Sequence, residues 1–502
     1  MNEITLTGVK ESKKTVLNLV CSIAEHLISG IIALTLTPLL IDRLGLELYG
    51  LYPVVLELSA VFGMIFGVVN STSGRYIAIE YERGNKENAQ KYFSSAFFAN
   101  SVIGILLLLP MALVITLSHR LLNVAAPFTQ DLKIFMILAF AAVVVDALSS
   151  VFGSVYYVTN RLELRSGQQF TSTAVKAVLL GTLLLAFRPS LTGVGVAILV
   201  SSTAGAAVQI AVSRRLMPDF SISLSSFSLS AVKRLTASGL WYSFNRIASF
   251  LMCGSMLILA SRFFRASATG QYSVAFVLVS ALVGIILTLG AVFVPISTKC
   301  FARGERKRLR DSLVRDERLI GCFASVAVSV AIAFCGDFLG LWIGDDASKL
   351  TISTTILLLI PVLSLACATP IINVAMVMDK TRRFSLFFLS GGFLTLATAL
   401  GVAYFGNLGV IGLAVVSSAA QLIWYSAAVP IFAGRMLECS PKCFLFPVLR
   451  VYLAAALSLT LCLAVNWVCD IKGWLALAIA AGCSCVVSAV ISFLVLFFGN
   501  RS

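Results

Sequence analysis

The chain has 502 residues, of which 59% are hydrophobic and 12% are charged, and its mean hydropathy is +0.97. Soluble domains carry about 25% charged residues, so this composition excludes a soluble globular protein and indicates a chain that crosses a membrane many times. The formal net charge is +15, and the positions of the basic residues decide whether this excess indicates a nucleic-acid partner or a membrane topology.

Fourteen apolar runs follow one another along the chain and are separated by short polar loops. A helix that spans a bilayer needs about 20 mostly apolar residues. We predict one such helix in each of the runs 16–41, 49–70, 93–117, 132–158, 168–187, 191–212, 237–261, 270–296, 319–343, 352–378, 384–405, 408–433, 446–468 and 472–498. The runs are too long for the strands of a membrane barrel. The predicted fold class is therefore all-α, a polytopic membrane protein with 14 transmembrane helices.

The basic residues are distributed unequally between the two sides of the predicted membrane. Counted by loop, 28 Lys and Arg residues lie on the side of the N-terminus and 8 lie on the other side. Cytoplasmic loops are enriched in these residues, so we predict that both termini are cytoplasmic. This bias accounts for most of the net charge without a nucleic acid. The two remaining basic residues, Lys176 and Arg246, lie inside predicted helices.

An internal repeat relates the two halves of the chain at an offset of 220 residues. Charged residues and glycines align at equivalent places: Lys13-Lys14 with Lys233-Arg234, Glu25-His26 with Asn245-Arg246, and Arg83-Gly84 with Arg303-Gly304. Because the repeat contains six helices, the two halves have the same orientation in the membrane. Halves of this kind are related by an axis along the membrane normal, as in certain secondary transporters.

The repeat predicts the domain organisation. We expect an N-terminal six-helix lobe at 1–215, a cytoplasmic connector with an amphipathic helix at 216–236, and a C-terminal six-helix lobe at 237–435. Two additional transmembrane helices follow at 436–502. The basic segment 299–318 is expected to attract anionic lipid headgroups in general, without forming a defined site.

Ionisable residues inside the helices are the candidate functional residues, because a charge in the bilayer is costly and usually faces a cavity or a partner. They are Glu25 and His26 in the first helix, Glu57 in the second, Asp146 in the fourth, Lys176 in the fifth and Arg246 in the seventh, with Asp379 at the end of the tenth. Polar neighbours at spacings of three and four residues place several of them on one helix face.

Five of these polar residues are predicted to line a substrate cavity: Arg246, Asn245, Lys176, His26 and Glu25. Arginine suits a phosphate because its planar guanidinium donates two parallel hydrogen bonds. Glu25, Asp146 and Glu57 are candidates for ion coupling. The structural alternative is that the charges pair with one another, Glu25 with Arg246 and Asp146 with Lys176.

Two loop segments carry a family resemblance. LGLELYGLY at Leu44–Tyr52 and the ERGN–K element at Glu82–Lys86, together with the 6 + 6 + 2 arrangement of helices, resemble the polysaccharide transporter family. This family includes O-antigen and related oligosaccharide flippases of the multidrug/oligosaccharidyl-lipid/polysaccharide exporter superfamily. The resemblance implies two six-helix lobes around a central cavity that opens alternately to each side of the bacterial inner membrane.

The resemblance also implies the cargo and the partners. The cargo would be an undecaprenyl-diphosphate-linked oligosaccharide destined for O-antigen or another surface polysaccharide, with membrane lipids, a polysaccharide polymerase and chain-length machinery as partners. We expect no cofactor and no metal, since the twelve cysteines show no metal-ligand spacing. A lipid II flippase with a basic cavity and a cation-coupled multidrug exporter with an acidic one are the alternatives.

An enzyme is the alternative from a different class. A membrane glycosyltransferase or polysaccharide polymerase needs a substantial external loop for its catalytic residues, and the longest external loops here, 118–131 and 344–351, are short. We therefore predict a transporter. No P-loop is present in the sequence, so energy must come from an ion gradient or from the concentration difference of the cargo.

Overall fold

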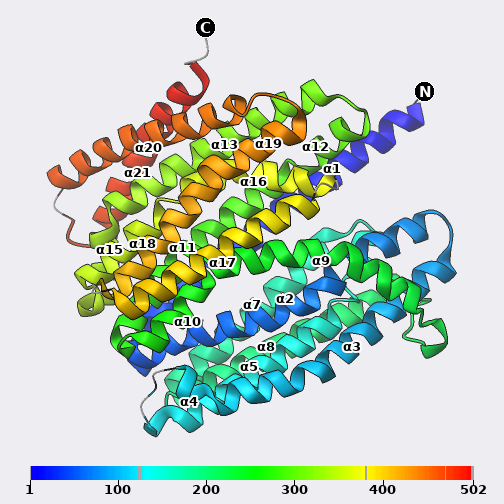
Figure 1. Ribbon diagram of the computed structural model, residues 1–502, viewed down its shortest axis with the longest axis horizontal. Coiled ribbons are helices and arrows are strands. Elements are labelled where there is room, and N and C mark those ends of the chain that lie inside the picture. Colours follow the sequence, from blue (N-terminus) through cyan, green and yellow to red (C-terminus); the bar gives the residue numbers. More distant parts are fainter. Residues whose placement is uncertain are drawn as a thin grey trace. The chain divides into compact units, whose positions relative to one another are not determined.

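The structure, a computed structural model, describes residues 2–122, 124, 126–378, 381–406, 408–469 and 471–498. Every regular element within these residues is a helix, which confirms the predicted all-α class. The described chain forms two compact units that meet in sequence between Phe250 and Leu251. Figure 1 shows long helices in both units, with the order of the chain given by colour.

The first unit contains the helices that precede the division. They are α1 (Asn2–Leu44), α2 (Leu46–Glu82), α3 (Lys86–Thr116), α4 (Ser118–Leu121), η1 (Ala126–Phe128), α5 (Thr129–Ser149), α6 (Ser154–Val158), α7 (Leu162–Ala186), α8 (Leu191–Leu216), η2 (Leu224–Ser226) and α9, which spans Leu229–Met252 and ends just beyond the division.

The second unit contains the remaining helices. They are α10 (Gly254–Phe263), α11 (Ala266–Val292), α12 (Val294–Ala302), α13 (Arg306–Ala333), α14 (Cys335–Ile343), η3 (Gly344–Asp346), α15 (Lys349–Leu359), α16 (Val362–Val377), α17 (Thr381–Phe405), α18 (Gly409–Ile423), η4 (Trp424–Ala428), α19 (Val429–Leu437), α20 (Lys442–Val468), α21 (Trp474–Phe493) and η5 (Leu494–Phe498).

The predicted number of transmembrane helices agrees with the structure. Twelve helices in the described chain are long and apolar enough to cross a membrane, and the number rises to 14 when each of two bent helix pairs is counted as one span. The bent pairs are α9 with α10 and α13 with α14, and the second pair bends by 65°. All fourteen apolar runs therefore coincide with helices, and two of them are strongly bent at a helix break.

The turns after α2 and after α12 have the same geometry. Gly84 and Gly304 both adopt a positive φ, 77° and 70°, a conformation that glycine reaches without the steric cost a Cβ imposes. The same hydrogen bonds close both turns, from Asn85 N to Glu80 O and from Glu305 N to Cys300 O, at 2.9 and 3.0 Å. These residues are 220 apart, so the repeat seen in the sequence is reproduced in backbone geometry at this place.

Helix α9 packs against α2 within the first unit. Thr72 Oγ1 donates to the carbonyl of Leu235 at 3.1 Å, and the hydroxyls of Tyr76 and Ser238 are 2.9 Å apart. Gly239 lies so close to α2 that a Cβ built on it would be 1.9 Å from the carbonyl oxygen of Val68. The first half of the seventh predicted helix therefore belongs with the six helices before it.

The connector differs in detail from the prediction. The first unit continues past residue 215, where the sequence repeat placed its end, and includes the connector and nearly all of α9. Phe220 packs edge-on against Phe93 of α3, with ring centroids 5.6 Å apart. A single turn of 3-10 helix, η2, precedes α9, and the amphipathic sequence that follows is the first part of α9 itself rather than a separate helix.

The last two helices pack on α13 in the second unit. Ser329 Oγ donates to the carbonyl of Ala455 on α20 at 2.8 Å, and Ser325 Oγ donates to Ser492 Oγ on α21 at 2.8 Å. A Cβ on Gly321 would lie 2.4 Å from Val451, so this glycine allows α20 to approach closely. Small residues at such contacts are typical of helix packing in membranes.

Candidate functional site

Glu25, His26 and Ser29 form one polar group on α1. His26 Nδ1 lies 2.7 Å from Glu25 Oε2, and Ser29 Oγ donates to Glu25 Oε1 at 2.9 Å. Ser29 also reaches Thr173 Oγ1 on α7 at 3.3 Å. Lys176 is three residues beyond Thr173 and therefore lies on the same face of α7. The structure thus associates three predicted cavity residues, Glu25, His26 and Lys176, with the interface between α1 and α7.

Asn245 and Arg246 form a second group on α9. Arg246 is exposed, and within the described part of the chain its side chain makes no hydrogen bond and no ion pair. Asn245 is 6% exposed, and in the described chain both atoms of its amide lack a hydrogen-bond partner, as does the buried hydroxyl of Ser243. Buried polar groups without partners are rare and call for an explanation such as a ligand.

The carboxylate near Arg246 is Glu57 on α2, which interacts with it electrostatically. The ion pair of Glu25 with Arg246 that the sequence left open is not among the ion pairs of the described residues, where Glu25 contacts His26 and Ser29 instead. The internal repeat does not predict a functional role for Glu57, because the equivalent residue in the second half is the apolar Val277. Its closeness to Arg246 follows from the packing of α9 on α2, which no sequence pattern shows.

Asp146 forms a third group on α5. Its Oδ2 accepts a hydrogen bond from Ser202 Oγ of α8 at 3.1 Å. Among the described residues Asp146 makes no ion pair with Lys176, so the predicted alternative of a structural bridge between them is also not formed. Asp146 is exposed, and we retain it as a candidate for ion coupling.

Two asparagines position the backbone beside Asp146, and the sequence analysis missed both. Asn100, which is fully buried, donates to Asn70 Oδ1 at 2.7 Å and to the carbonyl of Ala147 at 3.1 Å, and Asn70 donates to the same carbonyl at 3.3 Å. The search for ionisable residues passed over them because both are neutral. The sequence does place two asparagine amides inside predicted helices. Because buried amides need hydrogen-bond partners, this placement could have indicated that the two residues contact each other or a backbone group.

The predicted site residues therefore lie in three groups joined to different helix pairs. Asp379 lies outside the residues that the structure describes. Among these groups, Arg246 has an exposed guanidinium that makes no hydrogen bond to the described residues. A charged group at a membrane helix cannot face lipid cheaply, so an exposed Arg246 requires water or an anion. The described residues contain no cluster of His, Cys, Asp and Glu suited to a metal ion.

Comparison with known proteins identifies the family. The family model described as "Polysaccharide biosynthesis protein" matches residues 16–301, which is more than half of the chain. The chain is also similar to the uncharacterized membrane protein EpsK of Bacillus subtilis (strain 168), with 23% identity over 461 residues that cover 92% of this chain and 91% of EpsK.

Solved structures with the same fold are transporters. The lipid II flippase MurJ in an inward closed conformation has a TM-score of 0.71 at 12% identity, covering 95% of this chain and 99% of MurJ. The eukaryotic MATE transporter AtDTX14 has a TM-score of 0.64 at 17% identity, covering 88% and 99%. An inward-facing multidrug resistance MATE transporter of the MOP superfamily has a TM-score of 0.62 at 12% identity, covering 84% and 98%.

These matches and the twelve to fourteen apolar helices describe a multi-pass membrane protein with a transporter fold. The chain belongs to the polysaccharide biosynthesis protein family, and the predicted resemblance to polysaccharide transporters of the MOP superfamily is confirmed.

Proposed function

We propose that the protein flips a polyprenyl-diphosphate-linked oligosaccharide from the cytoplasmic to the outer face of the bacterial inner membrane, for O-antigen or another surface polysaccharide. The carrier lipid is undecaprenyl diphosphate, and the flipped product is handed to a polysaccharide polymerase with its chain-length machinery. The protein acts as a transporter and makes no covalent change to its cargo. Membership of the family and the fold shared with a lipid flippase support this proposal.

The observation that carries the proposal is the exposed guanidinium of Arg246, which makes no hydrogen bond to the residues that the structure describes. A diphosphate has the negative charge and the acceptor oxygens that this guanidinium can bind. Arginine binds such an anion through two parallel hydrogen bonds. Lys176 on α7 adds a second positive charge within the same unit, and Glu25 contacts His26 on α1.

Glu57 gives the site a means of release. Its carboxylate acts on the same guanidinium, so an ionised Glu57 competes with the diphosphate and a protonated Glu57 does not. Transport by alternating access requires the protein to bind its cargo tightly in one conformation and weakly in the other. A ligand that binds both conformations with the same affinity does not shift the equilibrium between them. Protonation of Glu57 can supply that difference.

Lipid II is the rival cargo, since MurJ shares the fold. It also carries a diphosphate, so Arg246 does not distinguish the two cargoes, and selectivity must come from contacts with the sugar.

The test is reconstitution of the purified protein in vesicles that contain either a fluorescent undecaprenyl-diphosphate oligosaccharide or fluorescent lipid II, with headgroup exposure followed by a membrane-impermeant quencher. We expect faster exposure of the oligosaccharide; equal or faster exposure of lipid II would overturn this substrate assignment. A cationic drug exporter would move neither.

The ion-coupling candidates yield a prediction about pH. We expect Glu57→Gln to remove most of the pH dependence of cargo binding, because glutamine mimics the protonated state in which Arg246 is unopposed. Glu25→Gln and Asp146→Asn should retain the dependence, since their carboxylates contact His26 and Ser202. The measurement is the apparent Kd for cargo from pH 5 to 8 in each variant. An unchanged pH dependence in Glu57→Gln would exclude this residue as the coupling group.

A further inference from the structure

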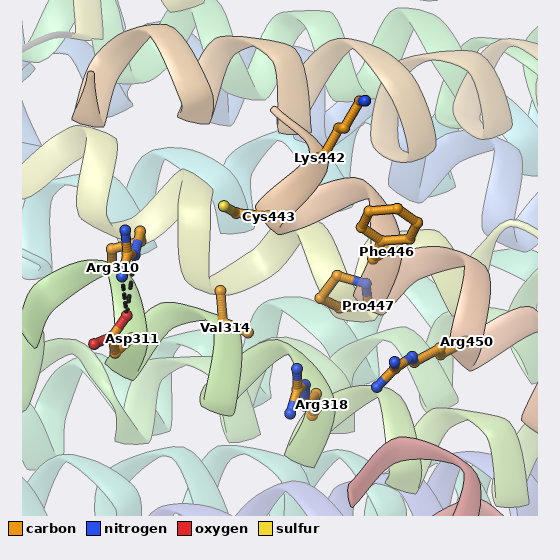
Figure 2. Close-up of a pocket in the computed structure, with 9 residues that line it drawn as sticks. All are labelled: Arg310, Asp311, Val314, Arg318, Lys442, Cys443, Phe446, Pro447 and Arg450. Atoms are coloured by element: carbon orange, nitrogen blue, oxygen red, sulfur yellow. Dashed lines mark hydrogen bonds and ion pairs between the residues drawn. The ribbon is translucent and has the colours of Figure 1, made fainter. Parts of the chain in front are cut away.

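A cationic cavity lies in the second unit, at the ends where α13 and α20 begin (Figure 2). Its volume is about 700 Å3, and four basic side chains line it with a single carboxylate, that of Asp311. The basic residues come from separate parts of the chain: Arg310 and Arg318 from α13, and Lys442 and Arg450 from α20. The close packing of α20 on α13 at Gly321 brings them together.

The one carboxylate that lines this cavity pairs with one of the four basic residues. Asp311 Oδ1 is held by Arg310, whose Nε and Nη2 lie 3.0 and 2.7 Å away. Arg318 and Arg450 are close enough to repel each other electrostatically, and the Arg450 side chain reaches toward Arg318 (Figure 2). The buried Nε of Arg318 has no hydrogen-bond partner among the residues that the structure describes.

A second carboxylate, that of Glu317, interacts with Arg318 but is fully buried and does not line the cavity. The like charges of Arg318 and Arg450 act unfavourably on each other, because charges of the same sign repel. A bound anion with several acceptor oxygens, such as a phosphate, would reverse the sign of this interaction and could bond to both groups.

One wall of the cavity is apolar and continues along α20. Phe446 and Pro447 line the cavity, and Phe446 shares a helix face with Leu453 and Leu457, at spacings of seven and eleven residues. These three side chains are 58%, 53% and 45% exposed. From Phe446 to Leu457 the strip is about 16 Å long at 1.5 Å per residue, which is close to half the hydrocarbon thickness of a bilayer.

We infer that this cavity binds the phosphate of an anionic phospholipid, with an acyl chain of the lipid lying along the exposed strip of α20. Free phosphate has the same headgroup chemistry, but it would leave the apolar wall and strip without a role. By the predicted topology the site lies in the cytoplasmic leaflet, where anionic lipids attract basic segments. The site is separate from Arg246 and does not depend on which cargo the protein moves.

Cys443 provides a reporter, because it lines the cavity and is partly exposed. The experiment measures how fast N-ethylmaleimide modifies Cys443 in the purified full-length protein in neutral detergent, read by mass spectrometry of its peptide. Cys469, which is exposed and outside the cavity, is the internal reference. Four additives are compared: phosphatidylglycerol, phosphatidylcholine, undecaprenyl phosphate and inorganic phosphate.

We expect phosphatidylglycerol to slow modification of Cys443 several-fold relative to Cys469, and phosphatidylcholine and inorganic phosphate to have little effect. In Arg318→Gln/Arg450→Gln the concentration of phosphatidylglycerol for half-protection should rise by at least about tenfold, as expected for loss of a charge-assisted hydrogen bond. The matched control is Lys307→Gln/Arg308→Gln, which removes two charges from the same helix outside the cavity and should keep wild-type protection.

Arg318 lies beside a buried carboxylate, so its replacement can impair folding. Arg450→Gln alone then carries the same test, with retention on size exclusion showing that it is folded. Protection by inorganic phosphate alone, or by undecaprenyl phosphate but not phosphatidylglycerol, would overturn the phospholipid assignment. Equal protection of the cavity variants and the Lys307/Arg308 control would show that surface charge alone attracts the lipid, and would also overturn it.

Discussion

Arg246→Ala is expected to lower the rate of cargo translocation by about 100-fold or more while leaving the protein folded in the membrane. The magnitude follows from the loss of two charge-assisted hydrogen bonds to the diphosphate, each of which changes an affinity by about tenfold or more. Folding should survive because Arg246 is exposed and makes no hydrogen bond or ion pair in the described chain. The measurement is the initial rate of headgroup exposure in proteoliposomes.

Two further variants test the reason for this effect. Arg246→Lys keeps the charge but loses the planar fork, so we expect an intermediate rate. Arg43→Ala removes the same charge at an exposed position beside Asp42 and should transport at the wild-type rate. A normal rate in Arg246→Ala would show that the guanidinium does not hold the cargo.

Gly239→Ala is expected to destabilise the first unit severely. A Cβ at this position would lie 1.9 Å from the carbonyl oxygen and 2.8 Å from the carbonyl carbon of Val68. Both are backbone atoms of α2, so relief requires α2 and α9 to separate, and overpacking of this kind costs about 1–3 kcal/mol or more. We expect a lower melting temperature in detergent and a lower yield of monodisperse protein.

Gly284→Ala is the matched control for this prediction. Gly284 lies within α11, and a Cβ there would meet nothing within 4 Å. Alanine should leave stability unchanged or raise it by up to about 1 kcal/mol, because glycine in a helix is entropically costly. If Gly239→Ala were as stable as Gly284→Ala, the close packing of α9 on α2, and with it the approach of Glu57 to Arg246, would be contradicted.

The number and places of the helices were predictable because each apolar run is long and the charges lie between the runs. The two strong bends, between α9 and α10 and between α13 and α14, were not predictable from the sequence. Proline is the usual cause of a kink, yet Pro53, Pro110 and Pro447 lie inside unbroken helices. The two strong bends fall instead at Cys253 and Phe334, neither of which is a residue that disrupts helices by itself.

The polar faces of the helices were also predictable, from spacings of three and four residues, but the partners on those faces were not. Arg246 is near Glu57, and Asp146 bonds to Ser202, because of how α9 lies on α2 and α5 lies on α8. A sequence gives the face of each helix and leaves open its rotation and its neighbour. For the same reason, the sequence of the basic segment 299–318 predicts no defined site. Two of the basic residues that line the cavity, Lys442 and Arg450, lie on α20, far from this segment in the sequence.

The central claim is that Arg246 holds the diphosphate of the cargo, and a comparison of two cargoes tests it most directly. Wild type and Arg246→Ala would each be assayed with the same oligosaccharide on undecaprenol through a diphosphate or through a monophosphate. We predict that wild type strongly prefers the diphosphate and that Arg246→Ala loses most of that preference. A preference of equal size in both proteins would contradict the claim, whatever the absolute rates.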